Sequence, residues 1–100
     1  MSQLNDIVAA EAAKLTILVA LADEPSRTSN EQLLQGYIDL QSGRAVSRIF
    51  VRERMLELEE LKAVKIKKAG ELLIASITLV GVEHVEGRSV IKGIQRPQAV

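Results

Sequence analysis

The sequence contains no cysteine, and this absence excludes two common ways of stabilising a small protein. Its 100 residues can form neither a disulfide framework nor a metal site built on thiolates. Stability must therefore come from a hydrophobic core, and a chain of this length has room for only one. We expect a single domain over residues 1–100, in which residues 88–100 form a C-terminal arm that packs locally or on a partner.

A long hydrophobic run is also missing. The longest apolar-rich stretch, from Ile7 to Ala22, is interrupted by Glu11 and Lys14, and it is shorter than the roughly 20 residues that cross a bilayer. No basic segment followed by an apolar one opens the chain. We therefore expect a cytoplasmic protein without a membrane partner.

Neither sign of charge is in excess. Thirteen lysines and arginines balance thirteen acidic residues, whereas proteins that hold nucleic acid through its phosphates often carry a basic excess. This balance argues against strong nonspecific DNA binding by the chain as a whole. Residues 62–68 depart from this balance, because they include four lysines and no acidic residue. A local basic patch is therefore still compatible with the sequence.

Motifs for catalysis are absent as well. The six glycines are dispersed and none matches a phosphate-binding loop. No Ser-His-Asp set or paired-carboxylate cleft is apparent, and the single histidine, His84, is expected to be structural or on the surface. We expect a protein that is not an enzyme and that needs no cofactor, metal or small-molecule ligand.

The first clear pattern that is present is helical. Apolar residues recur every three or four positions, which predicts a helix over residues 5–21. The predicted inward stripe is Leu4, Val8, Ala12, Leu15 and Val19. Apolar residues occupy the other sides too, so this helix is either central or partly covered by another chain, which favours a homodimer. Pro25 ends it, because proline disfavours helical geometry in the residue before it.

Two more helices are predicted from capping residues and spacing. Ser29 is the expected N-cap of a helix over residues 30–40, and Ser47 is the expected N-cap of a helix over residues 48–62. The inner face of the first is expected to be Leu33, Leu34, Tyr37 and Ile38. The inward stripe of the second is expected to include Val51, Met55 and Leu58.

A hairpin is predicted next, because the period changes from helical to alternating. Val64 and Ile66 face one way, and the lysines of the same segment face the other. Residues 69–71 form the reversal and residues 72–78 the antiparallel partner. A last helix, capped by Thr78, is expected to run through Glu86 and end at Gly87. This order, α+β but mainly α, is that of a winged-helix domain, with the second and third helices as its helix-turn-helix.

Several short segments resemble those of one protein family. They are Leu15-Thr16-Ile17-Leu18, Asn30-Glu31-Gln32-Leu33-Leu34, Val46-Ser47-Arg48, Glu86-Gly87-Arg88 and Gly93-Ile94-Gln95-Arg96-Pro97. Over residues 15–97 the chain resembles small winged-helix proteins encoded in Mu-like prophages. That resemblance implies a fold of the arsenic-repressor type and a role as a regulator. Metal-sensing relatives of that type typically use cysteines, so their sensing function does not carry over.

These observations favour double-stranded DNA as the partner of a phage or prophage transcriptional regulator. In a helix-turn-helix, the first residues of the second helix lie near base edges, and a wing meets the phosphate backbone or the minor groove. The expected DNA-binding residues are Ser47, Arg48, Ile49, Arg52, Lys65, Lys67 and Lys68. Arg48 and Arg52 are one helical turn apart, and an arginine can bind guanine through two hydrogen bonds.

Each of these groups also has a simpler interpretation. The two arginines can be merely solvated, and outward lysines on a strand can protect a sheet edge from aggregation. The third helix also carries acidic residues, which phosphates would repel: Glu53, Glu57, Glu59 and Glu60. The alternative function is therefore a protein-interaction or assembly module on the same fold, favoured by the apolar Ile49, Phe50 and Leu56.

Overall fold

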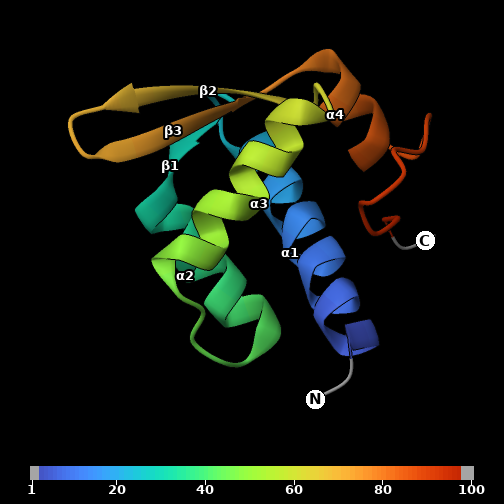
Figure 1. The fold of residues 1–100 in the computed structure, drawn as a ribbon. Coiled ribbons are helices and arrows are strands. Elements are labelled where there is room, and N and C mark those ends of the chain that lie inside the picture. Colours follow the sequence, from blue (N-terminus) through green and yellow to red (C-terminus); the bar gives the residue numbers. More distant parts are fainter. Residues whose placement is uncertain (1–2, 98–100) are drawn as a thin grey trace.

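The computed structural model describes residues 3–97 and has the predicted winged-helix order of elements (Figure 1). The elements are α1 (Gln3–Asp23), β1 (Thr28–Asn30), α2 (Glu31–Ser42), α3 (Arg48–Glu60), β2 (Val64–Ala69), β3 (Leu72–Ile77) and α4 (Leu79–Val85). The fold class is thus confirmed as mainly α with a small antiparallel sheet. Within residues 3–97, no helix is both long and apolar enough to cross a membrane.

The sheet has three strands in the order β1-β3-β2, one more than the predicted hairpin. β1 pairs antiparallel with β3, and Thr28 opposes Ser76 with 2.8 Å between their hydroxyl oxygens. A strand of three residues is too short to show an alternating period, so no sequence pattern indicates it. Ser29 was therefore wrongly assigned as a helix cap: it lies in β1, and Asn30 caps α2 by accepting from the Leu33 N–H at 2.9 Å.

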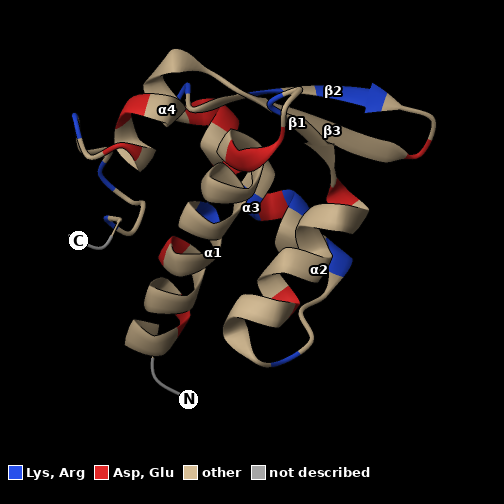
Figure 2. Cartoon of the chain, turned by 180° about the vertical axis from the view of Figure 1, so that it is seen from behind, with Lys and Arg blue, Asp and Glu red and all other residues tan. Residues whose placement is uncertain are grey.

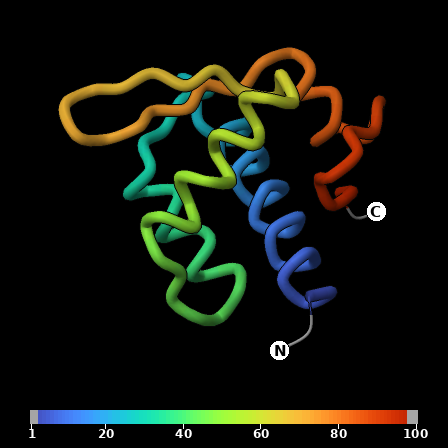
Figure 3. Tube along the Cα trace, in the orientation of Figure 1, coloured from blue at the N-terminus to red at the C-terminus, as the bar shows by residue number. Residues whose placement is uncertain are grey.

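β2 and β3 form the predicted hairpin. Their register runs from Val64 opposite Ile77 to Ala69 opposite Leu72. Gly70 has a φ of +61°, and a glycine with positive φ at the first position of a two-residue turn is typical of type II′ hairpins. The chain trace shows this hairpin reaching out beyond the helices, which is the arrangement of a wing (Figure 3).

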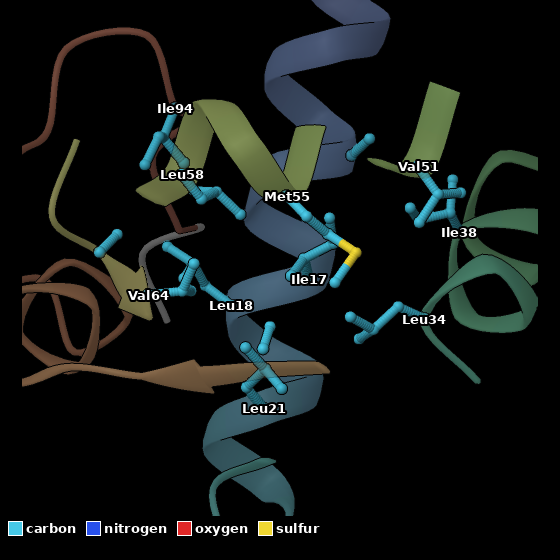
Figure 4. Packing of buried hydrophobic residues seen from close by; sticks show 13 residues of the cluster. Ile17, Leu18, Leu21, Leu34, Ile38, Val51, Met55, Leu58, Val64 and Ile94 are labelled. Atoms are coloured by element: carbon cyan, nitrogen blue, oxygen red, sulfur yellow. The ribbon is translucent and has the colours of Figure 1, made fainter. Parts of the chain in front are cut away.

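The core forms where α1 crosses α2 and α3 (Figure 4). Ile17, Leu18 and Leu21 of α1 are fully buried. The facing residues are Leu34 and Ile38 of α2 and Val51, Met55 and Leu58 of α3. The inward stripe predicted for α3 is thus confirmed, although α3 ends two residues early because Lys62 has a left-handed backbone, with φ +67°.

The inward stripe predicted for α1 is wrong. Val8 and Val19 are exposed, and so is Leu4, whereas the buried side is formed by residues 13, 14, 17, 18 and 21. α1 carries apolar residues on every side, so helical spacing alone cannot tell which side meets the core. On α2 the predicted inner face is confirmed for Leu34 and Ile38, which are buried, and is wrong for Leu33 and Tyr37, which are exposed.

The segment after α4 packs on its own chain. Ile94 belongs to the core, and the Gln95 N–H donates to the Glu11 carbonyl of α1 at 3.2 Å. His84, completely buried, has Nε2 2.9 Å from the Gln95 carbonyl and Nδ1 3.1 Å from the Ile91 N–H, which donates to it. The histidine is thus structural and holds this segment in place. Residues 98–100 of the expected arm lie outside the described residues.

Candidate nucleic-acid interface

The centre of the site is a buried carboxylate. Glu31 opens α2, and its side chain has no exposed surface. It accepts hydrogen bonds from Arg52 Nε at 2.8 and 3.0 Å, from Arg48 Nη1 at 3.2 Å and from the Leu73 N–H at 2.6 Å. One side chain therefore joins α2, the N-terminal half of α3 and the hairpin.

The two arginines make further hydrogen bonds within the protein. Arg52 Nη2 donates to the Glu71 carbonyl in the hairpin turn at 2.6 Å. Arg48 Nε donates to Gln35 Oε1 at 2.7 Å, and Gln35 Nε2 donates in turn to the Val46 carbonyl at 2.8 Å. Each arginine side chain is 39% exposed, so both are fixed by the protein while part of each guanidinium faces solvent.

Glu31 is ionised at neutral pH. Burial alone would raise the pKa of this carboxyl group, but the hydrogen bonds from Arg52, the Leu73 N–H and Arg48 outweigh burial and hold the pKa below its ordinary value of 4.5. Its negative charge offsets one of the two guanidinium charges. The pair of arginines therefore contributes a net positive charge to the surface.

Moving either arginine away from Glu31 would be unfavourable. Glu31 is fully buried, and a buried carboxylate that loses a hydrogen-bonded cation loses part of what offsets its desolvation. Arg48 and Arg52 are thus expected to stay in place when a ligand approaches.

The hairpin supplies the remaining positive charge. Lys65, Lys67 and Lys68 lie on β2 with exposed side chains, and none of them forms an ion pair within residues 3–97. The prediction that all three share one face is wrong for Lys68, because β2 pairs regularly with β3 and its side chains alternate, which puts Lys68 on the face of Val64 and Ile66. The blue of β2 in Figure 2 marks this lysine-rich strand. Arg52 connects it to α3 through the hairpin turn. We refer to Arg48, Arg52, Lys65, Lys67 and Lys68 together as the basic strip.

α3 has a different character on the side that points away from the core. Ile49 is 70% and Leu56 45% exposed, and Glu53 and Glu60 are exposed at neighbouring positions of the same helical face. We refer to these four residues as the outward face of α3. It contains no lysine or arginine, and Arg48 and Arg52 lie beside it, toward the wing.

The third side of α3 is fixed against α1. Arg54 donates to both carboxylate oxygens of Glu57 at 2.8 and 2.9 Å, and its guanidinium lies 4.6 Å from the centre of the Phe50 ring. Lys14 of α1 pairs with Glu57 at 3.4 Å. Burial would raise the pKa of Glu57, but Arg54 and Lys14 lower it below its ordinary value. Both Glu57 and Phe50 are therefore occupied within the fold.

The structure separates the predicted site residues into groups. Arg48, Arg52 and the three lysines form the basic strip, whereas Ile49 lies on the outward face of α3. Ser47 is the N-cap of α3, as predicted, and its hydroxyl accepts from the Phe50 N–H at 3.0 Å. Glu31 and Gln35 were not predicted, since they lie 17 and 13 residues from Arg48, a separation that leaves no local pattern to recognise.

A shallow surface groove lies on the opposite side of the helix-turn-helix. It runs between α1 and the segment that joins α2 to α3, has a volume of about 580 Å³ and is lined by Ala9, Ala12, Thr16, Gln41, Arg44 and Phe50, among others. A neighbouring groove shares Ala12, Thr16 and Gln41 with it. Neither groove contains a residue of the basic strip.

Comparison with known proteins identifies one relative. The chain is 33% identical over 95 residues to "Uncharacterized protein gp26" of Escherichia phage Mu, and this match covers 95% of the chain and 96% of that protein. No family model matches the chain. The relationship to Mu-like phages expected from the sequence is thus confirmed, while the arsenic-repressor type stays a prediction. This protein belongs to the family of phage Mu gp26.

Proposed function

We propose that this protein binds double-stranded DNA through the basic strip and acts as a phage or prophage transcriptional regulator. The observation that carries the proposal is the position of these cations: three exposed, unpaired lysines lie on the wing, and Arg52 of α3 donates to the turn of the same hairpin. Wings and the second helix of a helix-turn-helix are the elements that contact DNA in proteins of this fold. A chain with no net charge thereby places five cations on its wing and on the adjoining side of α3.

Lysine variants test the proposal without disturbing the fold, because the three lysines make no ion pair in the described chain. Wild-type protein should retard a duplex of about 30 base pairs at about 50 mM salt, where electrostatic binding is strong. Lys67→Ala with Lys68→Ala should weaken binding and lower the slope of log K against log salt by about one per lost phosphate contact.

Lys92→Ala is the matched control, because Lys92 is an exposed lysine outside the basic strip. It should bind DNA like the wild type. If Lys92→Ala and the double variant lose the same affinity, the basic strip is not the interface. If the wild-type protein retards no duplex at about 50 mM salt, DNA binding itself is wrong.

A protein-interaction or assembly module is the second candidate, and the outward face of α3 favours it. Two exposed apolar side chains beside two carboxylates suit a protein surface better than a phosphate-lined groove. Leu56→Ser should then abolish recruitment of a partner protein while leaving duplex retardation as in the wild type. Loss of both activities in this variant, with its fold intact, would contradict the separation of the two surfaces.

A further inference from the structure

We infer that the basic strip contacts the phosphate backbone edge-on and discriminates little between base sequences. This inference rests on the proposed DNA binding and specifies how that binding occurs. It departs from the arrangement expected from the sequence, in which Arg48 and Arg52 read bases in the major groove. Three features of the structure support it.

The first feature is the engagement of both guanidinium groups. An arginine reads guanine best with two neighbouring N–H groups directed at O6 and N7. In Arg52, Nε donates to Glu31 and Nη2 to the Glu71 carbonyl. In Arg48, Nε donates to Gln35 and Nη1 to Glu31. Nε is therefore already used in both arginines, so neither can pair side-on with a base through Nε and Nη together, whereas the Nη hydrogens left over can still donate to phosphate oxygens.

The second feature is the outward face of α3, the surface that would have to enter the groove. Guanine is typically read by arginine or lysine and adenine by asparagine or glutamine, and Ile49, Glu53, Leu56 and Glu60 include none of these residue types. Their contacts with bases would be limited to the thymine methyl group and the cytosine amino group. Glu53 and Glu60 would also be repelled by the phosphates on both sides of the groove. DNA is therefore expected to approach the wing side of α3.

The third feature is the position of the lysines. Lys65, Lys67 and Lys68 lie on the wing side of α3, and the Glu71 carbonyl that accepts from Arg52 lies at the turn of the same hairpin. Lysine ammonium groups on flexible stems are point charges that bind phosphate without sequence information. Because side chains alternate along β2, Lys65 and Lys67 lie on one face of the wing and Lys68 on the other. The lysines can thus contact phosphates on both faces of the wing, with the outward face of α3 turned away.

Selection from a randomised duplex pool tests the inference directly. Full-length protein is used to enrich the pool over several rounds at about 50 mM salt, and the affinities for enriched and unselected duplex are compared. We expect them to agree within about tenfold, whereas sequence-specific proteins prefer their sites by about a thousandfold or more. Ile49→Ser should change the affinity for unselected duplex by less than about twofold, because Ile49 faces away from the DNA.

Two results would overturn the inference and leave DNA binding intact. One is an enriched sequence bound about a hundredfold or more tighter than the unselected pool. The other is a loss of tenfold or more in Ile49→Ser with unchanged thermal stability, which would place the outward face of α3 in the groove. A wild-type protein that binds no duplex, by contrast, would refute the proposed function itself.

Discussion

Glu31 joins three elements of the fold through its side chain. Its carboxylate accepts from two arginines and one backbone N–H, and these partners come from α3 and β3. As the first residue of α2, it also lies where the helix dipole favours a negative charge. A residue buried for structural reasons thus determines which directions the guanidinium groups of Arg48 and Arg52 can face.

The pH dependence of stability should reveal this role. The pKa of Glu31 is lower in the folded than in the unfolded protein, so its contribution is fully present above about pH 4.5 and is lost as the pH falls through the folded-state pKa. Glu31→Gln should be about 3 kcal/mol less stable than the wild type at pH 7. The difference in unfolding free energy should shrink as the pH falls below 4.5.

Urea unfolding at a series of pH values measures this difference. Glu57, whose pKa is also lowered, is present in both proteins, so its effect cancels. Glu60→Gln, an exposed position on α3, should stay within about 0.5 kcal/mol of the wild type at pH 7. A gap between wild type and Glu31→Gln that is the same at pH 7 and pH 3 would show that Glu31 acts through packing and not through charge.

At the scale of elements, α3 was predictable and α1 was not. Val51, Met55 and Leu58 recur every three or four positions on α3 and most of its other positions are charged, so this buried stripe follows from spacing. α1 is apolar all round, and only its packing against α2 and α3 selects Ile17 and Leu18. β1 was not predicted, because it consists of three residues that form a strand only by pairing with β3.

The site was predictable only in part, because some of its contacts join residues that are far apart in the sequence. Residue type and position in the helix-turn-helix select Arg48, Arg52 and the wing lysines from the sequence. Their partners Glu31 and Gln35 come from another helix, so their contacts appear only once the chain is folded. Long-range pairing of charges thus limits what the sequence can say about the direction of each arginine.

α1 also supports the expected homodimer, which we retain as a proposal. Ile7, Val8 and Val19 remain exposed after the C-terminal segment has packed on its own chain, and exposed apolar patches are typical of association sites. At about 100 µM protein, light scattering should give twice the mass of one chain. Ile7→Lys with Val8→Lys should give a monomer, whereas Leu79→Lys, at an exposed leucine of α4, should remain dimeric. A monomeric wild type would contradict the proposal.

At the scale of the whole molecule, the charges cancel in number but are unevenly distributed over the surface. Positive charge gathers along the wing and the adjoining side of α3, while the outward face of α3 carries carboxylates and exposed apolar side chains. The Glu31 network holds the wing and α3 in one fixed relation. Our central claim is that DNA binds the basic strip and no other part of the described surface.

Mapping backbone amide NMR shifts during titration with a random duplex tests that claim most directly. The account predicts that, at about 50 mM salt, the largest changes occur at Arg48, Arg52 and residues 65–71, that they diminish as salt is raised, and that Ala12 and Thr16 in the groove beside α1 stay unchanged. Shifts concentrated along that groove, or no shifts at saturating duplex, would contradict it.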